Sequence, residues 1–125
     1  LADDNVVNQK VARRLFEQMG YRIDVAADGF EAFQAVQKQD YQIVFMDVQI
    51  PEMDGLEATR QIRRFEQTQQ RTPCIIIAMT ASAMPGDRER CVSAGMDDYI
   101  SKPIQSRELF ALLESVNQRL IAVPN

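Results

Sequence analysis

Apolar and polar residues follow two different periods along the chain, and each period predicts one kind of element. The continuously apolar runs 43–47 and 74–80 predict strands that are buried on both faces. Weaker alternation at 21–26 and 97–102 predicts two more strands. Apolar residues at helical spacing predict helices between them. These residues are Val7, Val11, Leu15 and Met19; Phe30, Phe33 and Val36; Leu56, Ile62 and Phe65; a weaker set within 85–94; and Leu109, Leu112, Leu113, Val116 and Leu120.

The ends of these helices carry recognisable signals. Asp28 can cap the amino end of the second helix, and Gly20 and Gly95 can end the first and fourth in a left-handed conformation. The stretch 66–73 is polar and shows no packing signal, so it is predicted to be a loop. Residues 122–125 look like a linker, which leaves one domain over 1–121.

Helices and strands in alternation predict an α/β fold, a doubly wound parallel sheet with helices on both faces. Such a sheet should have a strand of about five residues ahead of the first helix. Only the last one or two residues of that strand are expected near Ala2. The sequence leaves open whether the numbering begins inside a longer chain or the domain lacks this strand.

Composition excludes several functions. A net charge of -4 with few aromatic residues argues against binding of nucleic acid through this domain. The longest apolar runs are about six or seven residues, far short of a membrane span, so no direct membrane contact is expected. Histidine is absent, which removes His-dependent catalysis and most zinc sites. Cys74 and Cys91 are expected as buried, reduced thiols in the cytoplasm.

Polar residues stand at the carboxyl ends of the predicted strands, the edge where α/β sheets bind ligands. They are Asp3 and Asp4, Asp47, Thr80, and Lys102 with Pro103. Each has an ordinary alternative. Asp3 or Asp4 could cap the first helix, Thr80 could cap a turn, and Lys102 could be a solvated surface residue. Asp47 has no such alternative, because a carboxylate that ends a buried strand needs partners.

The charges of this set suggest its chemistry. Three carboxylates in one cleft would repel one another, whereas a divalent cation together with Lys102 neutralises them. Hard oxygen ligands in an open octahedral site suit Mg²⁺. Asp47 could then attack phosphorus as a nucleophile, while Thr80 and Lys102 each hold one phosphoryl oxygen.

In motif and order, the chain resembles the receiver domain of two-component response regulators. The motifs are Asp3-Asp4-Asn5, DVQIPEMDG at 47–55, MTASA at 79–83 and GMDDYISKP at 95–103. The resemblance covers essentially the whole chain. It implies a flavodoxin-like, five-stranded parallel sheet of order 2-1-3-4-5, whose first strand is largely missing here.

The resemblance also implies residue roles. Asp47 would be the phosphoacceptor. Asp4, Asp47 and the Gln49 backbone carbonyl would ligate Mg²⁺, with Asp3 acting through a metal-bound water. Thr80 would be the switch hydroxyl, and Lys102 the phosphate-binding lysine in a cis peptide with Pro103. Tyr99 would be the switch aromatic, for which the ordinary alternative is a half-buried strand residue.

The stretches 7–21 and 79–104 look most like receivers attached to hybrid sensor histidine kinases. This resemblance implies partners that carry the histidine, namely a kinase core, a histidine phosphotransfer domain, or both. The domain would catalyse only its own phosphorylation and dephosphorylation, as the cytosolic part of a membrane-bound sensor kinase or as a separate regulator.

Three rival functions remain. A phosphohydrolase with an aspartyl-phosphate intermediate would need a second Asp where Gln49 stands. A flavodoxin-like cofactor module would need a phosphate loop where Asp3-Asp4-Asn5 stands. A receiver that is never phosphorylated, and serves only in interactions, is the third.

Overall fold

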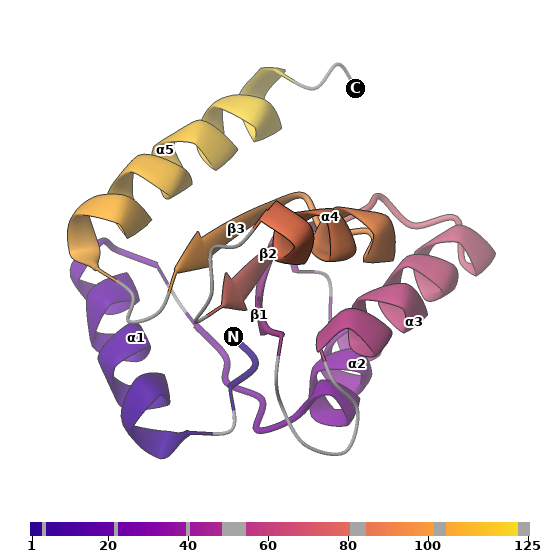
Figure 1. Cartoon of the computed structure of the whole chain (residues 1–125), viewed down its shortest axis with the longest axis horizontal. Coiled ribbons are helices and arrows are strands. Elements are labelled where there is room, and N and C mark those ends of the chain that lie inside the picture. Colours follow the sequence, from indigo (N-terminus) through magenta and orange to yellow (C-terminus); the bar gives the residue numbers. More distant parts are fainter. Residues whose placement is uncertain are drawn as a thin grey trace.

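The computed structural model describes residues 1–3, 5–21, 23–39, 41–48, 55–80, 85–101 and 105–122, of which 85–88 and 117–122 are described by their backbone alone. Helices and strands alternate around a sheet (Figure 1). The elements are α1 (Val6–Gln18), α2 (Gly29–Lys38), β1 (Ile43–Asp47), α3 (Gly55–Thr68), β2 (Ile75–Thr80), α4 (Pro85–Ala94), β3 (Asp98–Ser101) and α5 (Ser106–Ala122).

The three named strands form a parallel sheet in the order β1-β2-β3. Ala2 extends this sheet, because it makes one parallel bridge to Met46 of β1 and another to Ala26 on its other side. From one edge to the other, the order is therefore 26, 2, β1, β2, β3. This is the predicted order 2-1-3-4-5, with the first two members reduced to single bridges.

The strand predicted at 21–26 is not formed as a strand. Within the described part of this segment, only Ala26 bridges to another residue, namely Ala2. A strand forms only where its backbone has hydrogen-bonding partners on a neighbouring strand. Residues 1–3 provide such partners only at the carboxyl end of the segment 21–26.

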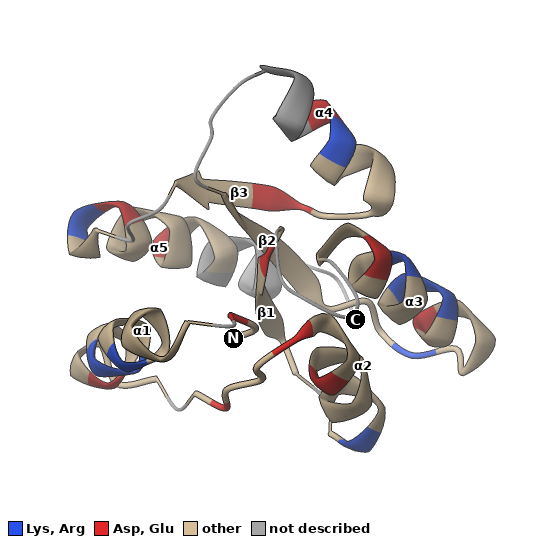
Figure 2. Ribbon diagram, turned by 60° about the horizontal axis from the view of Figure 1, so that its bottom comes forward, with Lys and Arg blue, Asp and Glu red and all other residues tan. Residues whose placement is uncertain are grey.

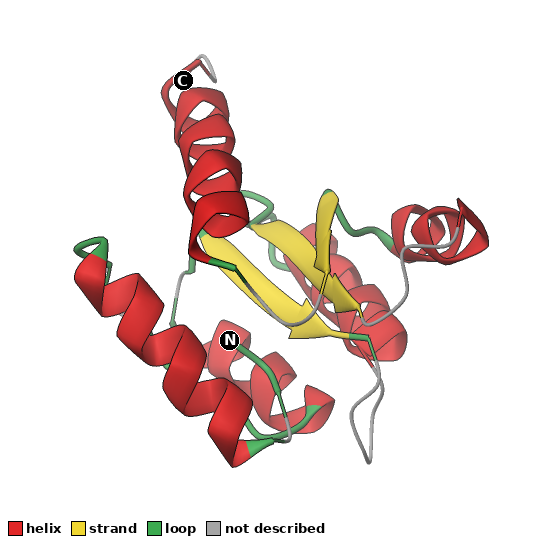
Figure 3. Ribbon diagram, turned by 60° about the vertical axis from the view of Figure 1, so that its left-hand side comes forward, coloured by secondary structure: helices red, strands yellow, loops and turns green. Residues whose placement is uncertain are grey.

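Helices cover both faces of the sheet (Figure 3). One core cluster joins the sheet to α2, α3 and α4, and the other joins it to α1 and α5. The two clusters share the strands by alternation, since Val44 and Met46 point into the first and Phe45 into the second. Phe45 packs edge-on against Phe16 of α1 at a centroid distance of 4.9 Å. No helix of the described residues is long and apolar enough to span a bilayer.

The apolar face predicted for α1 is partly wrong. Val7 and Val11 are 67% and 50% exposed, whereas Ala12 and Phe16 are buried. Leu15 and Met19 of the predicted face do pack against the core. The sheet contacts a stripe centred on Ala12 and Phe16, about a quarter turn or more from the two valines. Phe30 of α2 is likewise 51% exposed.

Other local signals are confirmed. The Asp28 carboxylate accepts a hydrogen bond of 2.8 Å from the Glu31 amide and caps α2. Gly20 and Gly95 have φ of +85° and +111°. Gly20 follows Met19, the capping residue of α1, and Gly95 directly follows α4. Cys74 and Cys91 are both buried and free. Burial, and then the nearby Glu66 carboxylate, raise the pKa of the Cys74 thiol to about 12.

A hydrogen-bonded network around Arg63 ties α3 to the amino end of the sheet. The Arg63 guanidinium donates to Glu66 at 2.8 Å, Asp97 at 2.7 Å, and the carbonyls of Gly95 at 2.8 Å and Cys74 at 2.7 Å. Burial alone would lower the pKa of Arg63, but the hydrogen bond and charge of Glu66 and the charge of Asp97 raise it overall. The guanidinium is thus a charged anchor among buried partners.

The prediction that the stretch 66–73 is a loop without packing contacts is wrong. Glu66 lies within α3, is 4% exposed, and accepts a hydrogen bond of 2.7 Å from the Cys74 amide. Arg71 donates to the carbonyl of Val36 at 2.7 Å and lies 5.0 Å from the centre of the Phe65 ring. The partner of Arg71 lies 35 positions away, so local polarity could not reveal this contact.

We expect Arg63→Met to lower the free energy of unfolding by about 3 kcal/mol, because Glu66 would remain buried without its cation. The matched control is Arg60→Met on the same helix. Arg60 also pairs with an acidic residue three positions away, Glu57, but both side chains are about half exposed, at 51% and 44%. Urea denaturation should show a much smaller loss there, because solvent screens an exposed ion pair. Equal losses in the two variants would contradict the role given to Arg63.

Candidate functional site

The carboxyl edge of the sheet brings together acidic residues from two adjacent chain segments. Asp3 follows Ala2 and Asp47 follows Met46, and Ala2 and Met46 are parallel bridge partners. Asp3 and Asp47 therefore hold equivalent places on neighbouring segments. They are 1% and 4% exposed, so two carboxylates are buried at this edge.

Backbone bonds on both sides of Ala2 fix this placement. The Asp47 amide donates to the carbonyl of Ala2 at 2.9 Å, and the Asp3 amide donates to the carbonyl of Ala26 at 3.0 Å. The Asp3 side chain accepts a hydrogen bond of 2.9 Å from the Asn5 amide. Asp3 does not cap α1, because Asn5 takes that role and accepts from the amides of Val7 and Asn8.

Asp47 also lies against the beginning of α3. The Gly55 amide donates to the carbonyl of Val48 at 3.1 Å. A Cβ atom on Gly55 would overlap the carbonyl oxygen of Asp47 and lie 2.9 Å from its carbonyl carbon. Only glycine permits this approach. The hydroxyl of Thr59 donates to the Gly55 carbonyl at 2.8 Å and holds the first turn in place.

Thr80 and Tyr99 come from the next two strands. Thr80 is the last residue of β2. It directly follows Met79, which pairs with Asp47 in the ladder. Tyr99 of β3 pairs with Ala78, is partly buried, and packs against the core cluster that contains α2, α3 and α4. Thus Asp3, Asp47 and Thr80 share one edge, while Tyr99 lies further back along the sheet.

Four predicted site residues lie outside the described residues, namely Asp4, Gln49, Lys102 and Pro103. Their roles as metal ligands, phosphate-binding lysine and cis peptide stay predictions. Within the described ranges, no group of three or more acidic or thiol side chains is gathered closely enough to hold a metal ion. The described residues contribute two of the three predicted carboxylates, Asp3 and Asp47. The third, Asp4, lies outside the described residues.

The charge of the described edge suits a cation. β1 and β3 each carry one acidic residue, and none of the three strands carries Lys or Arg. The basic residues drawn in Figure 2 lie on the helices and on the segment after α3. Two buried carboxylates in such surroundings are hard oxygen donors that repel each other. The donor set therefore fits a hard divalent cation such as Mg²⁺.

Two contributors to the site were not predicted from sequence. Gly55 follows Asp54 at the start of a helical pattern, and a glycine at that point could have signalled a close backbone approach. Asn5 is a favoured capping residue directly ahead of α1. Both signals are present in the sequence, but neither identifies the residue that Gly55 or Asn5 contacts.

Known proteins resemble this chain in sequence and in fold. The family model of the response regulator receiver domain matches residues 1–114. The chain is 39% identical to hybrid signal transduction histidine kinase K of Dictyostelium discoideum over 91% of its length, and 40% identical to sensor histidine kinase GacS of Pseudomonas protegens over 86%. It spans only 10% and 12% of the length of these two relatives.

Solved structures agree with the fold. The receiver domain of sensor histidine kinase PA1611 from Pseudomonas aeruginosa is 41% identical, with a TM-score of 0.80 and 91% of each chain covered. That structure has a magnesium ion coordinated in its active-site cleft. A second match is 31% identical, with a TM-score of 0.83 and 92% and 82% of the two chains covered. It is a complex of the Saccharomyces cerevisiae phosphotransfer protein Ypd1 with the receiver domain of Ssk1. The predicted α/β fold is confirmed.

We expect Gly55→Ala to lower the free energy of unfolding by about 1–3 kcal/mol, because the new methyl group must displace the backbone of Asp47. Gly20→Ala is the matched control. It also places a side chain at a demanding backbone position, with φ of +85°, but its Cβ would meet nothing within 4 Å. Amide chemical shifts of Asp47 and Val48 should change in Gly55→Ala and stay constant in Gly20→Ala. Unchanged shifts in Gly55→Ala would contradict the contact.

Proposed function

The chain belongs to the response regulator receiver family, and from this premise we propose that it is the phosphoacceptor domain of a phosphorelay, with Asp47 as the acceptor. One observation carries the assignment to this residue. Asp47 is a 4% exposed carboxylate at the end of a buried strand, beside the equally buried Asp3. In this proposal the receiver comprises residues 1–121, and 122–125 form a linker.

We assign the metal site to the carboxylates of Asp3, Asp4 and Asp47 and the backbone carbonyl of Gln49. The buried acidic edge formed by Asp3 and Asp47 supports this assignment, as does the magnesium ion in the PA1611 receiver, which is 41% identical. Bound Mg²⁺ supplies neutralisation of the carboxylates and of the phosphoryl oxygens.

Asp47 carries the transfer itself. One of its carboxylate oxygens attacks phosphorus, the new O–P bond forms, and the P–N bond to the partner's imidazole breaks. The imidazole leaves as the neutral ring, because its other nitrogen carries the proton. The hydroxyl of Thr80 and the ammonium of Lys102 each hold a phosphoryl oxygen. β1 keeps the Asp47 backbone in place through the transfer, because it is bonded to the segments on both sides.

Thr80 and Tyr99 would convert phosphorylation into a change of shape. Thr80 is the last residue of β2. Tyr99 lies in the neighbouring β3, directly before Ile100, which pairs with Met79. A shift of the Thr80 hydroxyl towards a phosphoryl group would alter the space beside Tyr99. The partly buried state of Tyr99 supports this, because a ring held between core and solvent has two environments available.

The donor would be a histidine kinase core, a histidine phosphotransfer domain, or both. The chain has no histidine, so the phosphohistidine must come from another domain. The Ypd1 complex supports a phosphotransfer partner, and the relatives support a hybrid kinase as the parent chain. In this proposal the domain belongs to the cytoplasmic part of that chain.

We expect a small-molecule phosphodonor to add one phosphoryl group to the chain in the presence of Mg²⁺, as measured by intact mass. Asp47→Asn should remove the adduct, and Asp3→Asn should raise the Mg²⁺ concentration needed by about tenfold or more. Asp28→Asn is the matched control, because asparagine also caps helices well and α2 should stay intact. A folded wild-type chain that gains no mass would instead support a module that serves only in interactions.

A second expectation concerns the switch. At equal degrees of phosphorylation, Tyr99 ring resonances should shift in the wild type and in Thr80→Ser, which keeps the hydroxyl. They should not shift in Thr80→Val, which has a similar shape but no hydroxyl. NMR with labelled tyrosine would measure this. A full Tyr99 response in Thr80→Val would separate Tyr99 from Thr80.

A further inference from the structure

The side chain of Gln9 joins α1 to the acidic segment at the carboxyl edge of the sheet. Its amide nitrogen Nε2 donates to the carbonyl of Asp3 at 2.5 Å, and its backbone amide donates to the carbonyl of Asn5 at 3.0 Å. The second bond belongs to the regular ladder of α1. The first spans six positions and reaches back beyond the helix, to a residue that brings a carboxylate to the site.

Helical spacing explains why the side chain of Gln9 points towards the sheet. Gln9, Ala12 and Phe16 are three and four positions apart on α1, so they share one face of the helix. Ala12 and Phe16 are buried, and the Phe16 ring lies 4.9 Å from that of Phe45 in β1. An apolar residue would continue this buried face. The chain instead places a partly buried amide there, at the end of the face nearest to Asp3.

Hydrogen bonds reach Asp3 from the sheet and from α1. The Asp3 amide donates to the carbonyl of Ala26 at 3.0 Å, and the Asp3 carboxylate accepts from the Asn5 amide at 2.9 Å. With the bond from Gln9 to the Asp3 carbonyl, each polar group of Asp3 has a partner. A peptide unit is planar, so a fixed carbonyl also fixes the direction in which the chain leaves Asp3.

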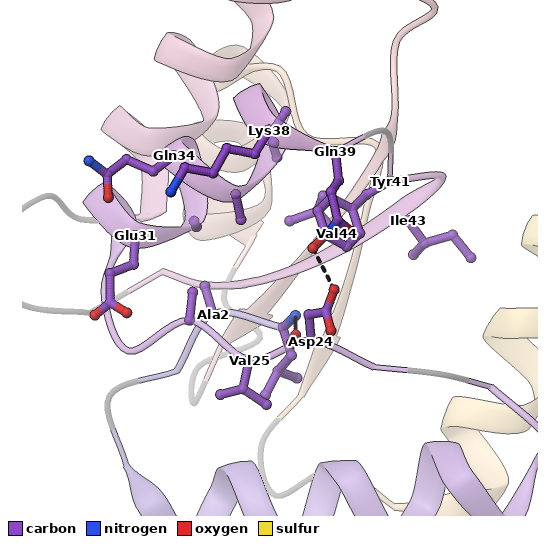
Figure 4. Close-up of a pocket in the computed structure, with 15 residues that line it drawn as sticks. Ala2, Asp24, Val25, Glu31, Gln34, Lys38, Gln39, Tyr41, Ile43 and Val44 are labelled. Carbon is purple, nitrogen blue, oxygen red and sulfur yellow. Dashed lines mark hydrogen bonds between the residues drawn. The ribbon is translucent and has the colours of Figure 1, made fainter.

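Packing alone leaves this segment incompletely held. Ala2, directly before Asp3, borders a cavity of about 310 Å³ on the side of α2 (Figure 4). Side chains next to a cavity lose contacts that a filled core would supply. The orientation of Asp3 therefore depends on its hydrogen bonds, and the bond from Gln9 is the one that ties it to a helix anchored on β1.

We propose that Gln9 is a positioning residue for the metal site, and that it sets the affinity for Mg²⁺ by holding Asp3 in place. This inference rests on the proposed function, in which Asp3 contributes to that site. Mg²⁺ demands nearly ideal octahedral geometry, so a carboxylate that is oriented before binding favours it. Residues that orient metal ligands typically control affinity without touching the ion.

The chemistry of glutamine suits this role. A carboxylate at position 9 could not donate to the Asp3 carbonyl, and an ammonium group would add a positive charge close to Asp3 and Asp47. A neutral amide fixes the backbone and leaves the charge that the cation meets unchanged. Glutamine is also a good helix former, so the first turns of α1 bear no cost for it.

The experiment compares Gln9→Met with Gln18→Met as the matched control. Methionine has nearly the length and helix propensity of glutamine but no donor. Gln18 is an exposed residue at the other end of the same helix, so the control makes the same chemical change away from Asp3. In the metal-free chain, the Asn5 amide resonance should shift in Gln9→Met and stay constant in Gln18→Met, because that amide donates to the Asp3 carboxylate.

Calorimetric titration then measures the dissociation constant for Mg²⁺. We expect it to rise by about tenfold in Gln9→Met and by less than about twofold in Gln18→Met. At saturating Mg²⁺, the rate of phosphorylation by a small-molecule donor should return to the wild-type rate in both variants, because Gln9 orients Asp3 rather than the attacking Asp47. A general loss of structure would lower this rate as well, which separates it from the positioning role.

The outcomes distinguish this inference from the proposed function. An unchanged dissociation constant in Gln9→Met, with normal binding in the wild type, would overturn the inference alone. A lower rate at saturating Mg²⁺ or equal changes in the two variants would also overturn it, because Gln9 would then act through the transfer or through the fold of α1. A wild-type chain that binds no Mg²⁺ would overturn the proposed function, and the inference with it.

Discussion

The site depends on the backbone hydrogen bonds that hold residues 1–3 between β1 and Ala26. A parallel sheet aligns the carboxyl ends of its strands, and the bonds from Ala2 to Phe45 and Asp47 place the following Asp3 at the level of Asp47. Two carboxylates are thereby buried side by side at one edge, where each raises the free energy of the other. Such a pair is costly as a purely structural feature and useful as a cation site.

The acidic side chains at the two ends of the sheet have different surroundings. At the amino end, Glu66 and Asp97 share the guanidinium of Arg63, so their charges are compensated within the protein. At the carboxyl end, the strands bring Asp47 but no Lys or Arg of their own. The first arrangement fixes helices to the sheet, and the second gathers two buried carboxylates as oxygen donors at one edge.

Sequence reasoning succeeded where residues close together in the chain determine the local structure. Continuous apolar runs predicted β1 and β2, Asp28 and the two left-handed glycines predicted helix ends, and the strand ends predicted Asp3, Asp47 and Thr80 at one edge. It failed where the cause lies far along the chain. Val7 and Val11 have helical spacing, but only the position of the sheet decides that Ala12 and Phe16 are the buried face. The packing of Arg71 likewise depends on a partner 35 positions away, the carbonyl of Val36.

Helix α3 connects the two ends and limits where movement can occur. Its first residue, Gly55, touches the backbone of Asp47. Arg63 and Glu66 fix its later turns to Cys74, directly before β2, and to the residues between α4 and β3. A helix held at both ends is a rigid reference rather than a moving part. A response that starts at Asp47 would therefore pass through the end of β2, at Thr80, into the neighbouring β3 that carries Tyr99. The same anchoring by Arg63 at Gly95 and Asp97 would hold the amino end of β3 still, so that a response is confined to the carboxyl half of the sheet.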